Sequence, residues 1–431
     1  MIDIRTRTAD LLGKTGVEPE QFWLGVFIFV VVAVSIGTAV SLGDILRFAD
    51  EYQYMSIARN LVDLGAYSIN GNTPTAYRPP SWPLLLAVGN LISYNVIWLR
   101  LINLVLHLST SLLLLRFTRR LGFPFAAALI TSAAYLFFPV LYFTATTFYP
   151  QTLCAFLIAL MLNIMLACGV WATAVLGILT SVTALAAPGT ALVLCLLVFL
   201  QTYHLPMRAM LLRLAVFGVA AALALTPWIA RNYMAFAAFI PLSTSAGENL
   251  LKGNLPGAGA DTGAAQVDID FYLKKVSGLP EPEADKKMGG FALEWILSNK
   301  REAAMLYVGK FLNWFNYRNN LATKGQATAI GSIVAFLSYY SVLIAAIVGS
   351  SMWSRSVESM SRPLNFWLWL FYIAAGLSYA ITFTRVRYRV PFEIILFILA
   401  TPFVARLTNW FDVVGNSTKT KVIPFLADHD R

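Results

Sequence analysis

Charged residues are scarce in this chain of 431 residues, and their scarcity limits what the protein can be. Asp, Glu, Lys and Arg make up 13% of the sequence, whereas soluble globular proteins carry roughly 25%. None of the four occurs between Leu121 and Tyr203, a stretch of 83 residues. No soluble fold leaves so long a stretch without solvating charge. The shortage excludes a soluble enzyme, a DNA-binding protein and a disordered chain, and it leaves a membrane protein with several spans.

Cysteine and histidine are few as well, with three of each. Cys154, Cys168 and Cys195 lie in apolar segments, so we expect them to pack rather than to react or bind metal. The histidines are scattered along the chain. The sequence also lacks a P-loop, the HExxH motif of zinc proteases, the GxSxG motif of hydrolases and paired cysteines. No cofactor is therefore predicted from a motif.

Apolar residues make up 58% of the sequence and gather in segments that approach the roughly 20 residues needed to cross a bilayer. We predict an all-α polytopic membrane protein with about ten transmembrane helices, within a range of roughly 9–12. The first segment has no clear small-residue cleavage site and is expected to stay as an anchor. The predicted spans are 22–42, 96–116, 123–143, 148–168, 170–186, 189–203, 210–230, 327–350, 363–384 and 391–409.

The basic residues predict the orientation of these spans. Lys and Arg outnumber Asp and Glu by 32 to 22, and most lie in segments that share one side if the N-terminus is cytoplasmic. We therefore expect a cytoplasmic N-terminus (1–21), a seven-span core (22–230) with an outer loop (43–95), and a second outer loop with interfacial helices (231–326). C-terminal spans (327–409) and a cytoplasmic tail (410–431) follow. The positive charge then suits anionic lipid headgroups, and no nucleic-acid partner is expected.

One segment, 301–318, fits either a span or a helix lying in the membrane interface. Glu302, Lys310, Asn313 and Asn316 form a polar stripe at helical spacing, which favours the interfacial helix.

That assignment places three arginines, Arg385, Arg387 and Arg389, on the outer side, against the usual charge distribution. Either the topology is off by one span, or these arginines bind an anion. Guanidinium groups match phosphate oxygens in pairs.

Acidic residues are absent from Leu64 to Gly247, which narrows the choice of a general base. Any carboxylate that acts at the outer face of the first half must come from the segment 44–63. Within it, Tyr54, Ile57, Ala58 and Leu61 recur at helical spacing and predict an amphipathic helix on the membrane surface. Gly65 is expected to end that helix.

Asp50, at the start of this helix, has two interpretations. Gln53 lies three residues further on, so the pair matches a capping box with Asp50 as the N-cap, and Glu51 would then lie in the first turn. Alternatively, Asp50 is a general base at the membrane surface. The two roles are compatible, although backbone hydrogen bonds lower both the pKa and the basicity of a carboxylate.

Two further arginines stand where the chain meets the membrane. Arg78 precedes the rigid segment Pro79 to Pro83, and Arg231 follows Trp228 at the end of the seventh span. Each is either an interfacial anchor or a ligand for phosphate.

Taken together, these segments resemble the GT-C membrane glycosyltransferases of the protein O-mannosyltransferase and aminoarabinose–lipid A transferase type. They recur in the family's order and cover most of the chain. The matching segments are Asp50-Glu51 with Tyr54, Ile57-Ala58, Gly65-Ala66-Tyr67-Ser68, Arg78-Pro79-Pro80, Pro83 to Leu86, Pro227-Trp228, Arg231-Asn232, Ser243-Thr244, Gly247, Asn249, Gly253-Asn254, Arg387-Tyr388-Arg389 and Pro391.

The resemblance implies an enzyme that takes a monosaccharide from a polyprenyl phosphate and transfers it, with inversion, to a lipid, glycan or protein acceptor. The reaction would occur at the periplasmic face of the inner membrane, among membrane lipids. The resemblance implies Asp50 and Glu51 as catalytic residues. The expected phosphate ligands are Arg231, Arg387, Arg389, Arg78 and Lys310. The expected contacts to the rest of the substrate are Tyr54, Glu248 and Asn249.

The sequence departs from this family at Gln151, where members often carry a second acidic residue. Because this second carboxylate is missing, the sequence only weakly supports a divalent metal bound between two loops. Three rival functions stay open at this point: a flippase or transporter of lipid-linked sugars, a polymerase or ligase with a pyrophosphate-linked donor, and a catalytically inactive relative. The absence of charge from the middle spans argues against translocation, because transporters place ionisable groups near the membrane midplane.

Overall fold

The computed structural model describes residues 19–167, 169–262, 267–318, 328–356 and 362–419, and within these ranges the chain is helical with no strand. This confirms the predicted all-α class. Most of the predicted N-terminal segment and tail, together with Cys168, lie outside the described residues. The longer helices are α2 (Pro19–Ser41), α3 (Ala49–Leu64), α4 (Ser81–Asn90), α5 (Val96–Arg120), α6 (Phe125–Leu136), α7 (Pro139–Ala145), α8 (Gln151–Met165), α9 (Val170–Ala184), α10 (Ala191–Thr202), α11 (Met207–Phe236), α12 (Ala246–Gly253), α13 (Asp270–Val276), α14 (Glu281–Ser298), α15 (Lys300–Asn313), α16 (Ala329–Ser356), α17 (Arg362–Ala380) and α19 (Glu393–Lys419).

Five of the described helices are long and apolar enough to cross a membrane, namely α2, α5, α11, α16 and the segment Val386–Thr408 around α19. The count rises to six if α6 and α7 form one span. The chain is thus a multi-pass membrane protein. Three more predicted segments form apolar helices that are shorter, α8, α9 and η1 (Pro188–Thr190) with α10. Length and composition therefore account for five or six of the roughly ten spans expected from the sequence.

The predicted span 123–143 is not a single straight helix. It consists of α6 and α7, which meet at an angle of 60°. Pro139 is the first residue of α7 and has no N–H for a continuous helix, so the chain bends at this point.

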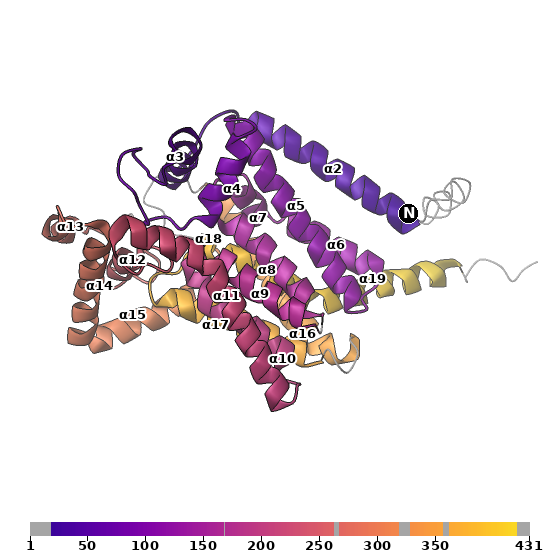
Figure 1. Cartoon of the computed structure of the whole chain (residues 1–431). Helices are drawn as coiled ribbons and strands as arrows, with labels where there is room; N and C mark the ends of the chain where they lie inside the picture. The colour runs from indigo at the N-terminus through magenta and orange to yellow at the C-terminus, as the bar shows by residue number, and fades with distance from the viewer. Residues whose placement is uncertain (1–18, 168, 263–266, 319–327, 357–361, 420–431) are drawn as a thin grey trace, which may run out of the picture.

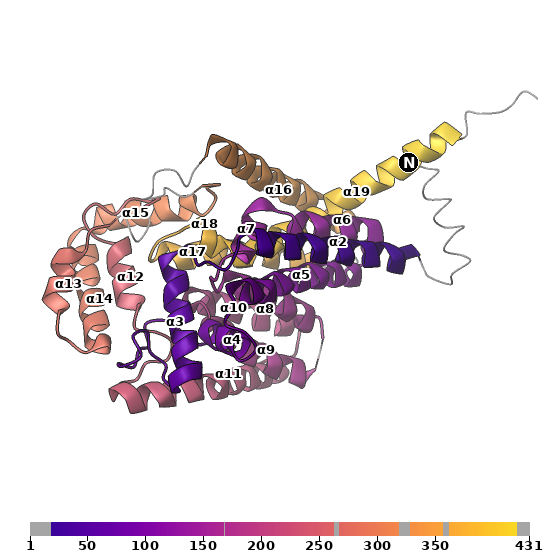
Figure 2. The same cartoon turned by 90° about the horizontal axis from the view of Figure 1, so that it is seen from above.

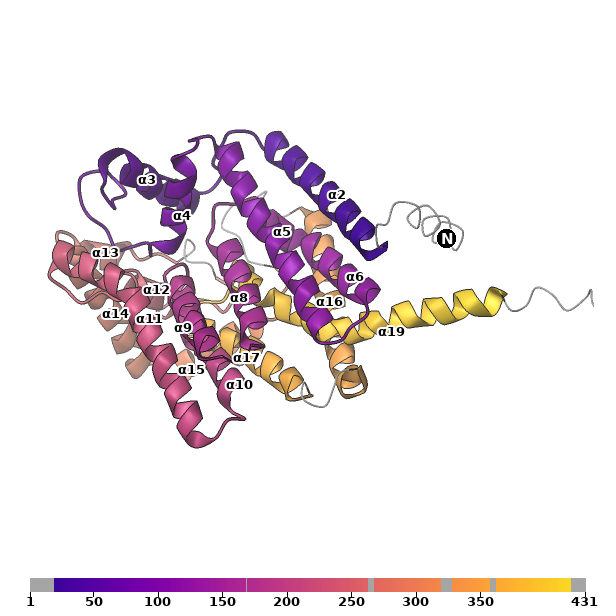
Figure 3. The same cartoon turned by 45° about the vertical axis from the view of Figure 1, so that its right-hand side comes forward.

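Polar contacts at both ends show how α2 and α5 are paired. At one end of the pair, Glu20 lies 3.7 Å from Arg119. At the other end, the buried Arg100 donates from Nη1 to the carbonyl oxygen of Gly43 at 2.7 Å and from Nη2 to that of Ile45 at 3.0 Å. The two helices are therefore antiparallel, and they run side by side in Figures 1 and 3.

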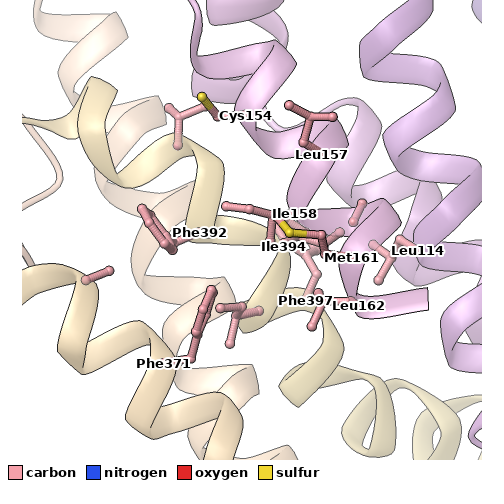
Figure 4. Close-up of a cluster of buried hydrophobic side chains, with 14 of the residues drawn as sticks. Leu114, Cys154, Leu157, Ile158, Met161, Leu162, Phe371, Phe392, Ile394 and Phe397 are labelled. Atoms are coloured by element: carbon pink, nitrogen blue, oxygen red, sulfur yellow. The ribbon is translucent and has the colours of Figure 1, made fainter. Parts of the chain in front are cut away.

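The core lies where α5 and α8 meet α17 and α19. Figure 4 shows interdigitating side chains from these elements, including Leu114, Ile158, Phe371 and Phe397. The drawn side-chain atoms are carbon and sulfur, with no oxygen or nitrogen. Ile158 is completely buried and Ile394 is 1% exposed. This packing joins the C-terminal helices to the first half of the chain, so residues far apart in sequence share one scaffold.

Helices α3 and α12 to α15 gather at one end of the bundle, away from the start of α2 (Figures 1 and 2). Helices α12 and α14 are in close contact, because a Cβ at Gly247 would overlap the carbonyl oxygen of Asp285. The carboxylate of Asp285 accepts hydrogen bonds from the backbone N–H groups of Gly247 and Glu248 at 2.8 and 3.1 Å. These contacts satisfy the start of α12.

Candidate active site

Asp50 is the centre of the candidate site, because both of its carboxylate oxygens accept a hydrogen bond from an arginine. Arg78 Nη2 lies 2.7 Å from Oδ1, and Arg387 Nη1 lies 2.9 Å from Oδ2. Burial alone would raise the pKa of Asp50, but the two guanidinium groups outweigh burial and hold that pKa below its usual value of 3.8. Asp50 is therefore ionised at neutral pH, with part of its charge already neutralised.

The start of α3 explains why Asp50 is available for these contacts. The helix begins at Ala49 with Phe48 as the N-cap, and Glu51 reaches back to the N-cap backbone. Glu51 Oε2 accepts from the N–H groups of Arg47 and Phe48 at 2.6 and 3.2 Å. The predicted capping box of Asp50 with Gln53 is thus wrong, because the N-cap lies two residues earlier, at Phe48, and the third residue of the helix, Glu51, makes the capping contact.

Glu51 also joins α3 to another part of the chain. Its Oε1 accepts from the backbone N–H of Phe148 at 3.0 Å, and its side chain is 1% exposed. Although adjacent in sequence, Asp50 and Glu51 therefore differ in role. Glu51 is enclosed by backbone donors, whereas Asp50 is partly exposed and bound by side chains that a substrate can displace.

The rest of α3 confirms the predicted amphipathic pattern. Tyr54, Ile57 and Ala58 are buried, and the helix ends at Gly65, whose φ of +64° is left-handed. This buried face packs within the protein, partly against α4, rather than on lipid headgroups.

Arg78 is fixed by several groups besides Asp50. It donates from Nε and Nη2 to Gln53 Oε1 at 2.9 and 2.7 Å. Its guanidinium lies 5.0 Å from the centre of the Tyr54 ring and 5.2 Å from that of Tyr77. Gln53 was predicted only as a capping partner, so the sequence did not reveal that it orients Arg78.

Arg387 is held between two tyrosines. Its Nη2 lies 2.9 Å from the hydroxyl of Tyr388, and its guanidinium is 5.1 Å from the ring centre of Tyr149. The Nε of Arg387 is buried and has no hydrogen-bond partner among the residues that the structure describes. Arg387 thus has a donor that an incoming anion can engage.

A cavity of about 460 Å³ lies next to this cluster. It is lined by Tyr54, Tyr77 and Arg78 of the first outer loop, and by residues from the start of α8, from η1, from the start of α12 and from 378–388. Neither Asp50 nor Arg387 lines the cavity directly, although Arg78 and Tyr388, which contact them, do. The volume suits a small ligand.

A second cavity of about 700 Å³ is lined by Pro80, the residue after Pro79, which lines the first cavity. Its lining comes from α3, α4, α8, α9 and α11, and it is almost entirely apolar. Arg231 borders this second cavity. Its guanidinium donates to the carbonyl oxygens of Thr75 and Tyr67 at 2.8 and 2.9 Å. The structure therefore places Arg231 apart from Asp50.

Arg389 also lies away from Asp50. Its Nε lies 2.5 Å from Glu393 Oε1, and its Nη1 donates to the carbonyl oxygens of Trp314 and Asn316 at 2.6 and 2.7 Å. Its guanidinium lies 3.6 Å from the ring centre of Tyr339, and its side chain is 2% exposed. The spacing of Arg389 and Glu393, four residues apart, was the sequence signal that could have identified this structural pair.

Lys310 is buried within α15 and lies against the turn after α17. Its Nζ donates to Asn254 Oδ1 at 3.0 Å and to the carbonyl oxygen of Thr382 at 2.7 Å. Burial lowers the pKa of Lys310 from 10.5 to about 8. The polar stripe expected to face lipid headgroups therefore packs on protein at Lys310 and Asn313, and α15, with 14 residues, is too short to span.

The remaining predicted contacts lie on α12. Asn249 lines the cavity next to Asp50, whereas Glu248 forms an ion pair with Lys252. The sequence missed the neighbouring Glu281, at the start of α14. It accepts from Thr75 Oγ1 at 2.8 Å and from the N–H of Ala76 at 2.7 Å, and it also accepts from Thr244.

No three His, Cys, Asp or Glu side chains of the described ranges come together in an arrangement that could hold a metal ion. We therefore assign no residues to a metal.

Comparison with known proteins gives a small number of similar structures. No family model matches the chain, and no curated protein does. Among solved structures, the chain is similar to ArnT from Cupriavidus metallidurans bound to undecaprenyl phosphate, with 17% identity and a TM-score of 0.46 over 93% of this chain and 81% of that one. The apo structure of the same protein gives 17% identity and a TM-score of 0.44 over 91% and 80%.

Proposed function

We propose that the chain is a GT-C-type glycosyltransferase that transfers a monosaccharide from a polyprenyl phosphate to a lipid, glycan or protein acceptor, with inversion. The observation that carries the proposal is the Asp50 cluster, in which one carboxylate is bound by two arginines beside a cavity with a few polar groups; a larger and more apolar cavity is lined by Arg231. Displacement of a phosphate by a hydroxyl needs a base, a cationic group for the phosphate, and space for a sugar and a lipid.

In this proposal the two cavities separate the parts of the donor. The sugar occupies the cavity lined by Tyr77 and Arg78, and the first isoprene units occupy the apolar cavity bordered by Arg231. The phosphate lies between them, at Pro79, which lines the first cavity, and Pro80, which lines the second. Arg78 and Arg387 are the proposed phosphate ligands.

Binding of the phosphate changes the state of Asp50. A phosphate that takes over Arg387 removes the donor 2.9 Å from Asp50 Oδ2 and frees that oxygen. Without this cation, the pKa of Asp50 rises and the carboxylate becomes a better base. The competition therefore couples donor binding to activation of the acceptor.

The chemical step is a displacement at the anomeric carbon. The acceptor hydroxyl loses its proton to Asp50, and its oxygen forms a bond to the anomeric carbon from the face opposite the phosphate. The bond from that carbon to the phosphate oxygen breaks, and its electron pair remains on the phosphate, beside Arg387. A positioned base contributes about 10²–10⁴-fold to such a reaction.

The proposal also includes the arrangement in the membrane. The end of the bundle that carries α3 and α12 to α15 faces the periplasm, and both termini lie in the cytoplasm. The seven-span unit 22–230 supplies most of both cavities. The helices of 231–326 form a cap, and the spans of 327–409 supply Arg387.

The test is a donor assay on the full chain in lipid nanodiscs. A panel of polyprenyl-phosphate monosaccharides is offered, with and without a chelator and with a crude envelope extract as acceptor, and released polyprenyl phosphate is measured. We expect release by the wild type and at least about 10²-fold less by Asp50→Asn. Asp63→Asn, on the exposed side of α3, is the matched control and should keep full activity. Absence of release from every donor would favour a flippase or an inactive relative.

A further inference from the structure

The cavity beside Asp50 has few charged groups in its wall. Of the described residues that line it, only Arg78 is charged, and none carries a carboxylate. The acidic groups nearby are already engaged, because both oxygens of Asp50 accept from arginines and Glu248 pairs with Lys252. An ammonium group in this cavity would lose water without gaining a counter-ion, which is unfavourable.

Neutral polar groups take the place of charge in the wall. Gln151, at the start of α8, lines the cavity and is 5% exposed, yet its Oε1 has no hydrogen-bond partner within the described part of the chain. A buried acceptor without a partner is unusual, and a ligand hydroxyl that donates to it would remove the deficit. Ser243 and Ser245 line the same cavity and lie within hydrogen-bond distance of each other, with 3.1 Å between their hydroxyl oxygens.

Aromatic rings supply the remaining recognition. Tyr379 and Tyr388 both line the cavity and are stacked, with ring centres 5.2 Å apart and an angle of 10° between the rings. Such rings offer broad apolar surfaces, and a sugar ring presents C–H groups on its faces and hydroxyls at its edge. A mainly apolar wall with a few placed polar groups is typical of small-molecule sites.

We propose that this cavity selects a neutral, hydroxyl-bearing donor sugar over an amino sugar, and that Gln151 is a specificity-determining residue that accepts a hydrogen bond from a sugar hydroxyl. The proposal rests on the proposed function, because it names the sugar that occupies the same site. It also implies that residue 151 determines the preference between neutral and amino sugars. A carboxylate at this position would be a counter-ion for the ammonium group of an amino sugar, and Gln151 is not.

The experiment measures equilibrium binding to the full chain in nanodiscs. Three probes are used: undecaprenyl phosphate alone, the same lipid carrying glucose, and the same lipid carrying glucosamine with a free amine. We expect the wild type to bind the glucose form about tenfold tighter than the glucosamine form. Gln151→Glu should reverse this preference while its affinity for undecaprenyl phosphate alone changes less than about twofold. Gln21→Glu, the same change at an exposed position of α2, is the matched control and should leave the preference unchanged.

The outcomes separate this inference from the function on which it rests. Equal or tighter binding of the glucosamine form by the wild type would overturn the inference while the carrier still binds. An unchanged preference in Gln151→Glu would remove Gln151 from sugar recognition, provided that the variant still binds the carrier. Failure of the wild type to bind undecaprenyl phosphate in any form would instead reject the proposed donor, and the inference with it. Gln151→Leu gives a second measure, with an expected loss of about tenfold for the glucose form only.

Discussion

Asp50 and Glu51 are adjacent on α3, but their carboxylates have different hydrogen-bond partners and different roles. Glu51 accepts from backbone N–H groups of Arg47, Phe48 and Phe148, so its position is fixed by the fold. Asp50 accepts only from side chains, Arg78 and Arg387. A substrate anion can compete for side-chain guanidiniums, whereas it cannot replace the backbone donors of a buried cap. This difference makes Asp50, and not Glu51, the proposed base.

The first prediction concerns the pH dependence of activity. Asp50 has a pKa below 3.8 in the free protein, so its reactive, ionised form is lost only as the pH falls through that low value. Arg387→Gln removes one of the two cations, so the pKa should rise and the acid limb of kcat/KM should move to higher pH, by about 1–3 pH units. The position of the limb is read independently of the height of the profile. Arg59→Gln, on the exposed side of α3, should leave it in place.

The second prediction concerns the stability that Glu51 provides. Glu51→Gln replaces one carboxylate oxygen by an amide that cannot accept, so at least one backbone N–H at the start of α3 or at Phe148 loses its partner. We expect the free energy of unfolding in detergent to fall by about 1–3 kcal/mol. Glu294→Gln, an exposed glutamate of α14, should change it by less than about 0.5 kcal/mol. Equal stability of the two variants would contradict the capping role.

The sequence predicted the helical elements well and their ends less well. Apolar segments gave the positions of most helices and Gly65 gave the end of α3, because side-chain hydrophobicity and backbone freedom are local properties. The start of α3 was misplaced because Phe48 has no side-chain acceptor, so nothing in its type identifies it as an N-cap. The bend between α6 and α7 was also missed, although Pro139 marks it.

The candidate site was predicted in part, for a related reason. The motif order led to Asp50, Arg78 and Arg387, and the structure brings these three together. The same patterns could not tell which arginines point elsewhere. Arg389 pairs with Glu393, a partner that the spacing of four residues could have indicated, whereas the bond from Lys310 to Thr382 depends on how separate helices pack.

The third prediction concerns α15 as an element. Lys310 has a pKa of about 8 in the folded protein and 10.5 when unfolded, so the unfolded chain binds more protons between these values. Stability therefore rises with pH over this interval. Relative to Lys310→Met, the wild type should gain roughly 1–3 kcal/mol of unfolding free energy between about pH 7 and pH 10. A difference that stays constant with pH would show that Lys310 is not buried as described.

At the scale of the whole molecule, the two outer segments depend on each other through Glu281. This single carboxylate, at the start of α14, binds Thr75 and Ala76 of the first outer loop and Thr244 before α12. It thereby connects both sides of the cavity beside Asp50. The Glu281 contacts and the Asp285 contacts together fix the cap formed by α12 and α14.

The fourth prediction tests this connection. Glu281→Gln weakens three hydrogen bonds at once, and we expect backbone amides of 75–76 and 244–250 to exchange with deuterium at least about tenfold faster. Amides of α5 and α8, in the core, should be unaffected. Glu283→Gln, two residues further along and exposed, is the control. If the amides of 75–76 and 244–250 exchange at the same rate in the two variants, Glu281 does not hold the cap.

The pairing of Asp50 with Arg387 also has a consequence for synthesis. The two residues are 337 positions apart, and ribosomes add about 5–20 residues per second. Arg387 is therefore made roughly 20–70 s after Asp50, whereas Arg78, only 28 positions away, follows within a few seconds. During that interval Arg78 is the only one of the two arginine partners of Asp50 that has been synthesised. The complete charge cluster is among the last features that the growing chain can form.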